Sequence, residues 1–257
     1  MAFKKLELPV NVVNVTSTPL KLENSQGIAL IRTVSMYRAI RSAAFLEASG
    51  LHTINSSRTL HVCGDKALTY AILSSNGVKI PQTMLALGSE AAIKAFREIG
   101  GKVVDKPPIG SWGRLISLVR DERSMISLTN IRETLPSDLK GHLIQRYVET
   151  GGKDVRCLVL GSKVIGCVER LANNGWRSNV ALGASTKEIN VTEQLEDLSL
   201  RAAESVQGEF VAIDLLSDGE VYVNEVNGVP EFKGFMRATG IPVHELLAQH
   251  VKKVMRA

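Results

Sequence analysis

Three side chains with oxygen ligands near the C-terminal end of the chain have the types and spacing of a divalent-cation site. Asp214 lies inside the apolar run 211–216, and Glu225 and Asn227 lie two apart on the next strand-like run. Residues two apart share one face of a strand, and a tight turn can bring Asp214 beside Glu225. Such hard oxygen ligands suit Mg²⁺ that bridges phosphate oxygens. Ordinary polar strand ends are the alternative, but an unpaired carboxylate in an apolar run is costly.

A glycine-containing loop after an apolar strand is the second candidate. Lys106 ends the strand-like run 102–106, and Gly110 and Gly113 follow in a Pro/Gly-rich segment. A lysine at this place would face phosphates, and the glycines would let the backbone close over them. The chain contains neither G-x-x-x-x-G-K-[ST] nor G-x-G-x-x-G, so this is not a Walker or dinucleotide-binding loop. A purely structural turn explains this segment equally well.

Two further segments would complete a nucleotide site. The backbone of the strand-like run 143–149 could read an adenine edge, Glu149 could hold ribose hydroxyls, and Arg156 enters the next strand. Arg170 and Arg177 have the chemistry to stabilise transferred phosphoryl charge or to bind a carboxylate substrate. Each segment alone also fits a surface strand or a solvated loop.

These segments are positioned by strand-like runs that alternate with amphipathic helical stretches, which predicts a mixed α/β (α+β) architecture. Asp65 and Ser89 are expected to cap helices. We predict strands at 10–15, 27–32, 53–55, 84–86, 102–106, 115–119, 143–147, 155–160, 163–171, 209–216 and 220–226, and helices at 36–49, 57–63, 66–76, 89–99, 192–205 and 243–255.

Composition excludes several classes of protein. The 257 residues are 44% hydrophobic but only 5% aromatic, which predicts an aliphatic globular core. The formal charge of +5 fits an anionic ligand or an acidic partner but does not require one. No basic run interleaved with aromatic residues favours nucleic acid. Without an apolar run of about 18 residues or a secretory signal, we expect a cytoplasmic protein with no membrane contact.

The cysteines show no metal or redox motif. Cys63, Cys157 and Cys167 stand apart without a C-x-x-C spacing, and the last two lie in strand-like runs. We therefore interpret them as small buried hydrophobic residues.

Taken in order, these segments resemble the ATP-grasp superfamily. Within it they resemble the LysX/ArgX branch, which ligates amino acids to the small acidic carrier protein LysW and is related to RimK-type glutamate ligases. The resemblance covers residue 27 to the C-terminus and rests on Gly64-Asp65-Lys66, Lys106, Gly110 to Leu115, Gln145 to Glu149, Asp154 to Arg156, Arg177-Ser178-Asn179, Asp214, Glu225-x-Asn227 and Glu231-Phe232-Lys233. It implies an ATP-grasp fold with a shortened N-terminal α/β lobe (1–63), a central ATP-grasp lobe (64–145) and a C-terminal ATP-grasp lobe with the metal site (146–257).

The resemblance also implies a role for each group of residues. ATP would be bound by Lys66, Lys106, Gly110, Ser111, Trp112, Gly113, Arg114, Leu115, Ile116, Gln145, Arg146, Tyr147, Val148, Glu149, Asp154 and Arg156. Two Mg²⁺ ions would be held by Asp214, Glu225 and Asn227, and the transferred phosphate would be faced by Arg170, Arg177 and Asn179. The amino-acid pocket would be lined by Asn179, Val180, Ala181, Glu231, Phe232, Lys233, Gly234 and Phe235.

The implied reaction joins a carboxylate to an amine. ATP would phosphorylate the γ-carboxylate of the carrier's C-terminal glutamate, and the α-amine of the incoming amino acid would displace the phosphate. Gly234-Phe235 resembles the arginine branch, whereas the lysine branch typically has Asn-Ser. We therefore expect glutamate as the substrate, in arginine (ornithine) biosynthesis, with Phe235 occupying the space that α-aminoadipate needs. A homo-oligomer is also expected.

Several alternatives stay open. One methylene is worth only about 1–3 kcal/mol, so the enzyme could ligate α-aminoadipate in lysine biosynthesis, or both amino acids. A RimK-like enzyme that adds glutamate to another protein and a non-catalytic nucleotide-binding module are the others. Two departures from the family stand out: no strand and helix precede Val10, and Leu182 stands where many relatives have arginine, a charge that Arg177 would replace.

Overall fold

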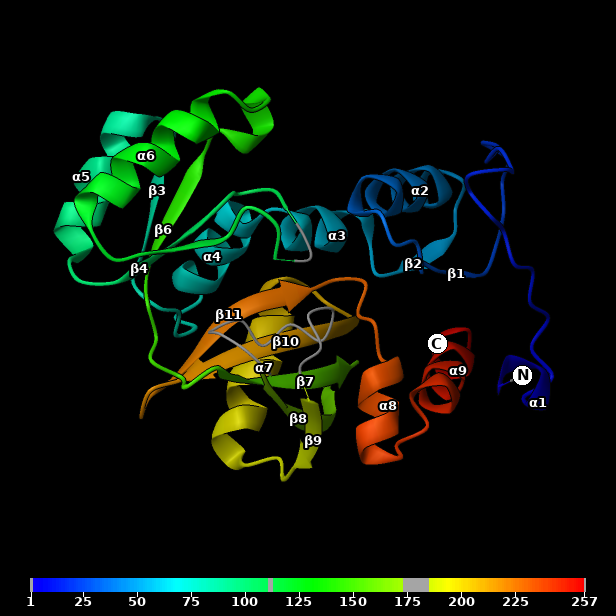
Figure 1. The fold of residues 1–257 in the computed structure, drawn as a ribbon. Coiled ribbons are helices and arrows are strands. Elements are labelled where there is room, and N and C mark those ends of the chain that lie inside the picture. The colour runs from blue at the N-terminus through cyan, green and yellow to red at the C-terminus, as the bar shows by residue number, and fades with distance from the viewer. Residues whose placement is uncertain (1, 111–112, 173–184, 257) are drawn as a thin grey trace.

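The computed structural model describes residues 2–110, 113–172 and 185–256, which form three sheets with helices packed around them (Figure 1). The helices are α1 (Ala2–Lys5), α2 (Met36–Ala48), α3 (Ser57–Gly64), α4 (Lys66–Ser75), α5 (Ser89–Ile99), α6 (Glu122–Glu133), the 3₁₀ turn η1 (Ser137–Leu139), α7 (Glu193–Ser205), α8 (Lys233–Thr239) and α9 (Val243–Val254). The strands are β1 (Ile28–Leu30), β2 (His52–Ile54), β3 (Thr83–Ala86), β4 (Val103–Lys106), β5 (Ser117–Val119), β6 (His142–Arg146), β7 (Lys153–Leu160), β8 (Lys163–Leu171), β9 (Ser185–Ile189), β10 (Phe210–Ser217) and β11 (Val221–Asn227). The predicted mixed α/β architecture is confirmed.

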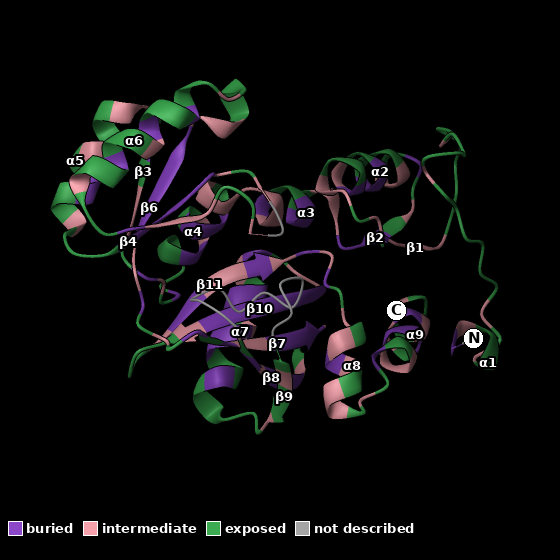
Figure 2. Ribbon diagram, viewed as in Figure 1, coloured by how far each residue is buried: buried purple, intermediate pink, exposed green. Residues whose placement is uncertain are grey.

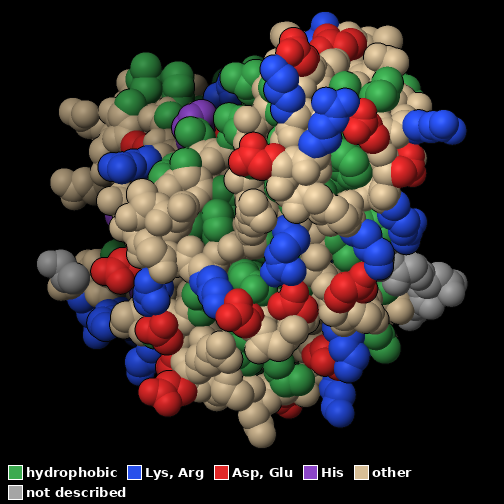
Figure 3. Space-filling model, turned by 90° about the vertical axis from the view of Figure 1, so that its left-hand side faces the viewer, with side chains coloured by type: hydrophobic (Ala, Val, Ile, Leu, Met, Phe, Trp, Pro, Cys, Tyr) green, Lys and Arg blue, Asp and Glu red, His purple; other side chains and the backbone are tan. Residues whose placement is uncertain are grey.

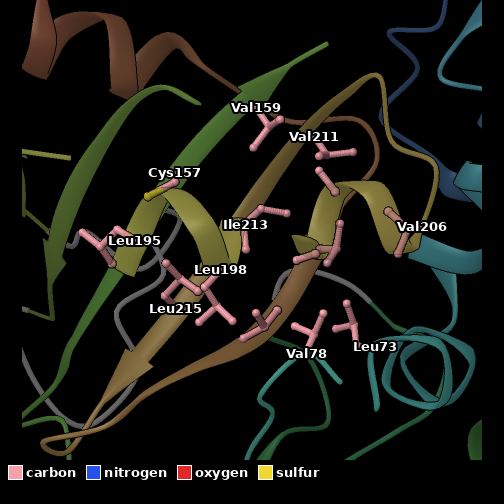
Figure 4. Packing of buried hydrophobic residues seen from close by; sticks show 14 of the residues in the cluster. Leu73, Val78, Cys157, Val159, Leu195, Leu198, Val206, Val211, Ile213 and Leu215 are labelled. Atoms are coloured by element: carbon pink, nitrogen blue, oxygen red, sulfur yellow. The ribbon is translucent and has the colours of Figure 1, made fainter. Parts of the chain in front are cut away.

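The C-terminal half is built on a five-stranded antiparallel sheet in the order β11-β10-β7-β8-β9. Its central strands are apolar on both faces, since one face packs on α7 and the other on α8 and α9. Ile213 and Leu215 of β10 point toward Leu195 and Leu198 of α7 (Figure 4). Because side chains alternate along a strand, Asp214 points to the opposite face. The packing of two aliphatic residues thus fixes the direction of the carboxylate between them.

The central part of the chain forms a four-stranded antiparallel sheet in the order β3-β6-β4-β5. Helices α5 and α6 cover one face, where Phe96 and Met125 pack against Val103 and Ile144. The alternation of β4 therefore places Lys106 on the face away from α5 and α6. Figure 1 shows that the five-stranded sheet with β10 and β11 lies on this side.

The N-terminal part contains a two-stranded parallel sheet, β1-β2, packed with α2 and α3. The strand predicted at 10–15 is wrong: these residues form no helix or strand, and Val12 is 89% exposed. The apolar alternation there pairs with no strand among the described residues, and its side chains are mostly exposed (Figure 2). Ser89 is likewise not a cap, because it is the first residue of α5 and Gly88 precedes it at the N-cap position.

Two of the three cysteines are joined. Cys157 of β7 and Cys167 of β8 are direct cross-strand partners and form a disulfide. Their predicted burial in the core is confirmed, but the expectation that they have no redox chemistry is wrong. A β-bulge between Leu158 and Val159 shifts the register of this hairpin by one residue and brings the two cysteines opposite each other. Cys63 is a free thiol whose pKa is raised to about 12, first by burial and then by the charge of Glu225.

No helix in the described part of the chain is long and apolar enough to cross a membrane. The face drawn in Figure 3 carries basic and acidic side chains intermingled with apolar ones, rather than a broad field of one charge.

Candidate active site

A cavity of about 550 Å³ lies between the four-stranded and the five-stranded sheets. Residues of β4 and β6 line it on one side, and residues of β7, β8, β10 and β11 line it on the other. The residues predicted for ATP that line it are Lys66, Lys106, Gly110, Gly113, Arg114, Ile116, Gln145, Arg146, Tyr147, Val148, Asp154 and Arg156. Two sheets far apart in the sequence therefore contribute to one binding space.

The three predicted metal ligands lie together at one end of the β10–β11 ladder. Asp214 is the cross-strand partner of Glu225, and Ala212 is the partner of Asn227. The amide nitrogen of Asn227 lies 3.5 Å from Oδ2 of Asp214. All three side chains line the cavity. The hairpin register thus places two carboxylates and one amide within reach of a common ligand.

Asp214 is a buried carboxylate that two arginines neutralise. Arg156 donates from Nε and Nη2 to the two oxygens of Asp214, each at 2.7 Å, and Nη2 of Arg170 lies 3.0 Å from Oδ2. Burial alone would raise the pKa of Asp214, but the charges of Arg156 and Arg170 outweigh it and lower the pKa to about 2. The carboxylate is therefore ionised at neutral pH, and both of its oxygens already accept from arginines, with which a metal ion would have to share them.

Arg170 connects this carboxylate to a second one. Its Nε and Nη2 donate to the two oxygens of Asp154, each at 2.6 Å, and only 4% of its side chain is exposed. Burial alone would lower the pKa of Arg170, but the charges of Asp214 and Asp154 raise it by a larger amount. The net shift is upward, so the guanidinium stays charged. The resulting chain Arg156–Asp214–Arg170–Asp154 alternates in sign, and all four residues line the cavity.

Lys106 is the buried cation of the opposite sheet. Its ammonium donates to Gln145 Oε1 at 2.7 Å, to Asn224 Oδ1 at 2.8 Å and to Tyr70 Oη at 3.1 Å. Burial lowers its pKa to about 8, although Glu225 opposes the shift. Three neutral oxygens take all three N–H groups, so an anion at Lys106 must exchange for at least one of them.

Lys66 stands at the first turn of α4. Asp65 caps this helix as predicted, since its Oδ1 accepts from the backbone N–H of Ala67 at 2.8 Å and of Leu68 at 3.2 Å. Nζ of Lys66 donates to the carbonyl of Gly110 at 2.6 Å and lies 3.4 Å from Oε1 of Glu225. Lys66 therefore lies between the glycine-containing loop and the candidate metal ligands.

The donor set fits Mg²⁺ with nucleotide phosphates better than a closed metal cage. Among the described residues no group of three or more His, Cys, Asp or Glu side chains could hold a metal ion. Mg²⁺ usually binds through one or two carboxylates and takes its remaining ligands from water and phosphates. The described lining carries more lysines and arginines than carboxylates, as a polyanion requires: Lys66, Lys106, Arg114, Arg146, Arg156 and Arg170 against Asp154, Asp214, Glu225 and Glu231.

Residues predicted for the amino acid lie at the α8 end of the cavity. Glu231, Gly234 and Phe235 line it, and Phe235 is 3% exposed. The Phe235 ring packs on β8 where Gly166 has no side chain, since a Cβ there would lie 2.9 Å from Cζ. The absence of a side chain at Gly166 therefore lets the Phe235 ring pack directly on β8.

Some predicted residues lie elsewhere. Leu115, Glu149, Phe232 and Lys233 do not belong to the lining. The carboxylate of Glu149 pairs with Lys102 at 2.5 Å, and its ribose role stays a prediction. The predicted residues Ser111, Trp112, Arg177, Asn179, Val180 and Ala181, together with Leu182, lie outside the described residues.

Sequence reasoning missed Tyr70 and Asn224. Tyr70 Oη donates to the backbone carbonyl of Asn224 at 2.6 Å, and both side chains accept from Lys106. A buried tyrosine needs a hydrogen-bond partner for its hydroxyl. This requirement was the one signal that could have pointed to Tyr70. The sequence does not reveal that α4 packs against β11, which creates the contact.

The chain is similar to known proteins in both sequence and fold. Residues 63–251 match the family model described as a RimK-like ATP-grasp domain. The chain is 46% identical, over 98% of its length and 92% of the relative's, to the glutamate–LysW ligase ArgX of Sulfurisphaera tokodaii. It is 31% identical, over 88% of its length and 80% of the relative's, to the α-aminoadipate–LysW ligase LysX of the same organism. A RimK domain ATP-grasp protein from Sphaerobacter thermophilus superposes with a TM-score of 0.76 at 21% identity, covering 97% of this chain and 92% of that one.

Proposed function

Because the chain belongs to the RimK-like ATP-grasp family of ligases, we propose that it is a glutamate–LysW ligase. It would join the γ-carboxylate of the C-terminal glutamate of a small acidic carrier to the α-amine of glutamate, in arginine (ornithine) biosynthesis. The observation that carries this proposal is the 46% identity to ArgX over nearly the whole of both chains, against 31% to LysX.

ATP would lie in the cavity between the two sheets. Lys66 and Lys106 would face its phosphates, and the lining residues of β6 and of the 147–156 segment would frame the adenine and ribose. Asp214, Glu225 and Asn227 would hold two Mg²⁺ ions, and these ions would supply positive charge to offset that of the phosphoryl group. Arg156 and Arg170 keep Asp214 ionised and in place, and this supports its proposed role as a ligand.

The two substrates would meet beside Arg170. The carrier carboxylate would take the phosphoryl group and become an acyl phosphate, which the amine of glutamate then attacks with release of phosphate. Glu231 and Phe235 would shape the amino-acid end of the cavity, where the ring of Phe235 limits chain length. The excess of positive charge in the lining supports an anionic substrate pair.

Three further features belong to the proposal. The formal charge of +5 fits an acidic carrier, and we propose that the protein works in the cytoplasm as a homo-oligomer. No nucleic acid or membrane takes part.

The test is ATP turnover with an acidic carrier that ends in glutamate, with glutamate and α-aminoadipate offered separately. ADP should form only when carrier and amino acid are both present, and the carrier should gain the mass of one glutamyl residue. A larger kcat/KM for α-aminoadipate would contradict the proposed substrate and favour a LysX-like enzyme, whose relative matches at 31% identity. Absence of ADP with every acceptor would contradict a ligase function.

A further inference from the structure

Arg132, on the last turn of α6, is a buried cation outside the cavity lining. Only 2% of its side chain is exposed. A guanidinium removed from water needs a paired charge and partners for its N–H groups. Its Nη2 pairs with the carboxylate of Asp105 and donates to the carbonyl of Leu115 at 3.0 Å, and its Nη1 donates to the carbonyl of Gly141 at 3.0 Å. One side chain therefore holds three separate segments of the central part of the chain.

Two of these segments are the ends of the connection between β4 and β5. Asp105 immediately precedes Lys106, and Leu115 lies between Arg114 and Ile116. Lys106, Arg114 and Ile116 all line the cavity. The guanidinium of Arg132 thus links two parts of the cavity wall. One is the end of β4 with Lys106, and the other is the segment around Leu115, where Arg114 and Ile116 line the cavity.

The third segment supports the connection from outside. Gly141 has no side chain where the ring of Pro108 packs, since a Cβ there would lie 3.0 Å from Cγ of Pro108. The carbonyl of Pro108 in turn accepts from the backbone N–H of Lys66 at 2.8 Å. Through Gly141, Arg132 therefore also fixes Pro108 and the first turn of α4.

Leu115 adopts a conformation that needs such support. Its φ is +57°, in the left-handed region that a non-glycine residue occupies only where its surroundings enforce it. The hydrogen bond from Arg132 to its carbonyl is one such restraint. Asp105 is held in turn by Nδ1 of His142, 3.0 Å from its second oxygen.

We propose that Arg132 is a positioning residue for the ATP-dependent reaction: it fixes both ends of the β4–β5 connection so that Lys106, Arg114 and Ile116 are in place before the nucleotide binds. The proposal rests on the ATP site of the proposed function, but not on which amino acid or carrier is used.

The first variant is Arg132→Lys, which keeps a positive charge beside Asp105. In the wild type Nη1 bonds Gly141 and Nη2 bonds Leu115, and a single ammonium nitrogen cannot occupy both positions. The dissociation constant for a non-hydrolysable ATP analogue with Mg²⁺ should rise about tenfold, as expected when one hydrogen bond to a charged group is lost. Trypsin should also cleave faster after the exposed Arg114, because its backbone is less restrained. KM for the amino acid should stay unchanged.

The matched control is Arg97→Lys. Nε of Arg97 donates to Glu122 at the first turn of α6 at 2.9 Å, so this variant makes the same replacement on a contact of the same helix, away from the cavity. It should bind the analogue and resist trypsin as the wild type does.

A second variant tests the loop end without disturbing a buried charge. Leu115→Val places a β-branched residue at positive φ, which is strongly unfavourable, whereas Leu115→Asn tolerates that conformation. Valine should weaken analogue binding and speed cleavage after Arg114, and asparagine should do so less.

Wild-type affinity and trypsin resistance in folded Arg132→Lys would overturn the proposal, and so would equal behaviour of the valine and asparagine variants. If Arg132→Lys does not fold, the Leu115 pair decides alone. Wild-type protein that binds the analogue but ligates no glutamate would instead overturn the proposed substrate, and this test would still apply.

Discussion

At the residue scale, ion pairs inside an apolar sheet determine the charge state and position of Asp214. Asp214 lies between Ile213 and Leu215, which pack on α7, and its carboxylate would be costly to bury alone. Arg156, on the adjacent strand β7, and Arg170, on β8 beyond it, supply the compensating charge. Arg156 and Arg170 therefore stabilise the folded sheet and also hold the Asp214 carboxylate in the candidate site.

This pairing predicts a specific loss of stability in acid. The pKa of Asp214 is lowered from 3.8 to about 2, so its ionised form stabilises the folded state above pH 4, and this contribution disappears as pH falls toward 2. We expect it to be about 2 kcal/mol. Urea unfolding from pH 5 to pH 2 measures it. Asp214→Asn should show a flatter profile over this window, and parallel profiles would contradict the pairing.

A second prediction concerns Phe235. Its ring borders the amino-acid end of the cavity and rests on Gly166. Phe235→Leu keeps an apolar side chain but frees space, so kcat/KM for α-aminoadipate relative to glutamate should rise about tenfold, the worth of one methylene. Steady-state kinetics with both amino acids measures the ratio. An unchanged ratio would show that another residue sets the length of the substrate.

Whole elements bring these residues together by register. The β10–β11 hairpin pairs Asp214 with Glu225, and the bulge in the β7–β8 hairpin pairs Cys157 with Cys167. The disulfide joins the two strands that carry Arg156 and Arg170. Strand pairing and one covalent bond therefore hold the arginines that neutralise Asp214.

The disulfide should stabilise this sheet measurably. Cys157→Ser with Cys167→Ser should lower the free energy of unfolding by about 2–3 kcal/mol. Urea unfolding with and without reductant measures the effect, and reductant should have no influence on the double variant. Cys63→Ser, which removes only the free thiol, is the control for a cysteine lost from the interior. Identical curves for wild type and double variant would contradict a stabilising role.

Helices and strands with a strong hydrophobic periodicity were predictable from the sequence. Those that form only because they pair or pack with a distant part of the chain were not. The hairpins 153–171 and 210–227, together with α2 and α4, were predicted within a few residues because their patterns are long and capped. Helix α6 was missed because its sequence is largely polar, and β9 because its pairing with β8 is not visible in its own residues. The Tyr70–Lys106 contact and the cysteine register depend on tertiary packing, which one sequence does not reveal.

At the scale of the whole molecule, the chain closes one cavity between two sheets. Asn55 ties the N-terminal part to the rest, since its amide donates to the carbonyls of Phe210 and Gly228 at 2.6 and 2.7 Å and accepts from the N–H groups of Glu209 and Phe210. This buried side chain thus fixes both the start of β10 and the end of β11. The family and ATP-grasp fold expected from the sequence are confirmed, and the assignment of individual site residues stays a prediction.

The most direct test of the account is to count bound divalent ions in the presence of a non-hydrolysable ATP analogue, with Mn²⁺ as the probe. Electron paramagnetic resonance should detect two Mn²⁺ per wild-type chain, fewer in Glu225→Gln and in Asn227→Ala, and the same two in Arg97→Lys. Two ions bound with wild-type affinity in both β11 variants would contradict the claim that Asp214, Glu225 and Asn227 hold the metal beneath the nucleotide phosphates.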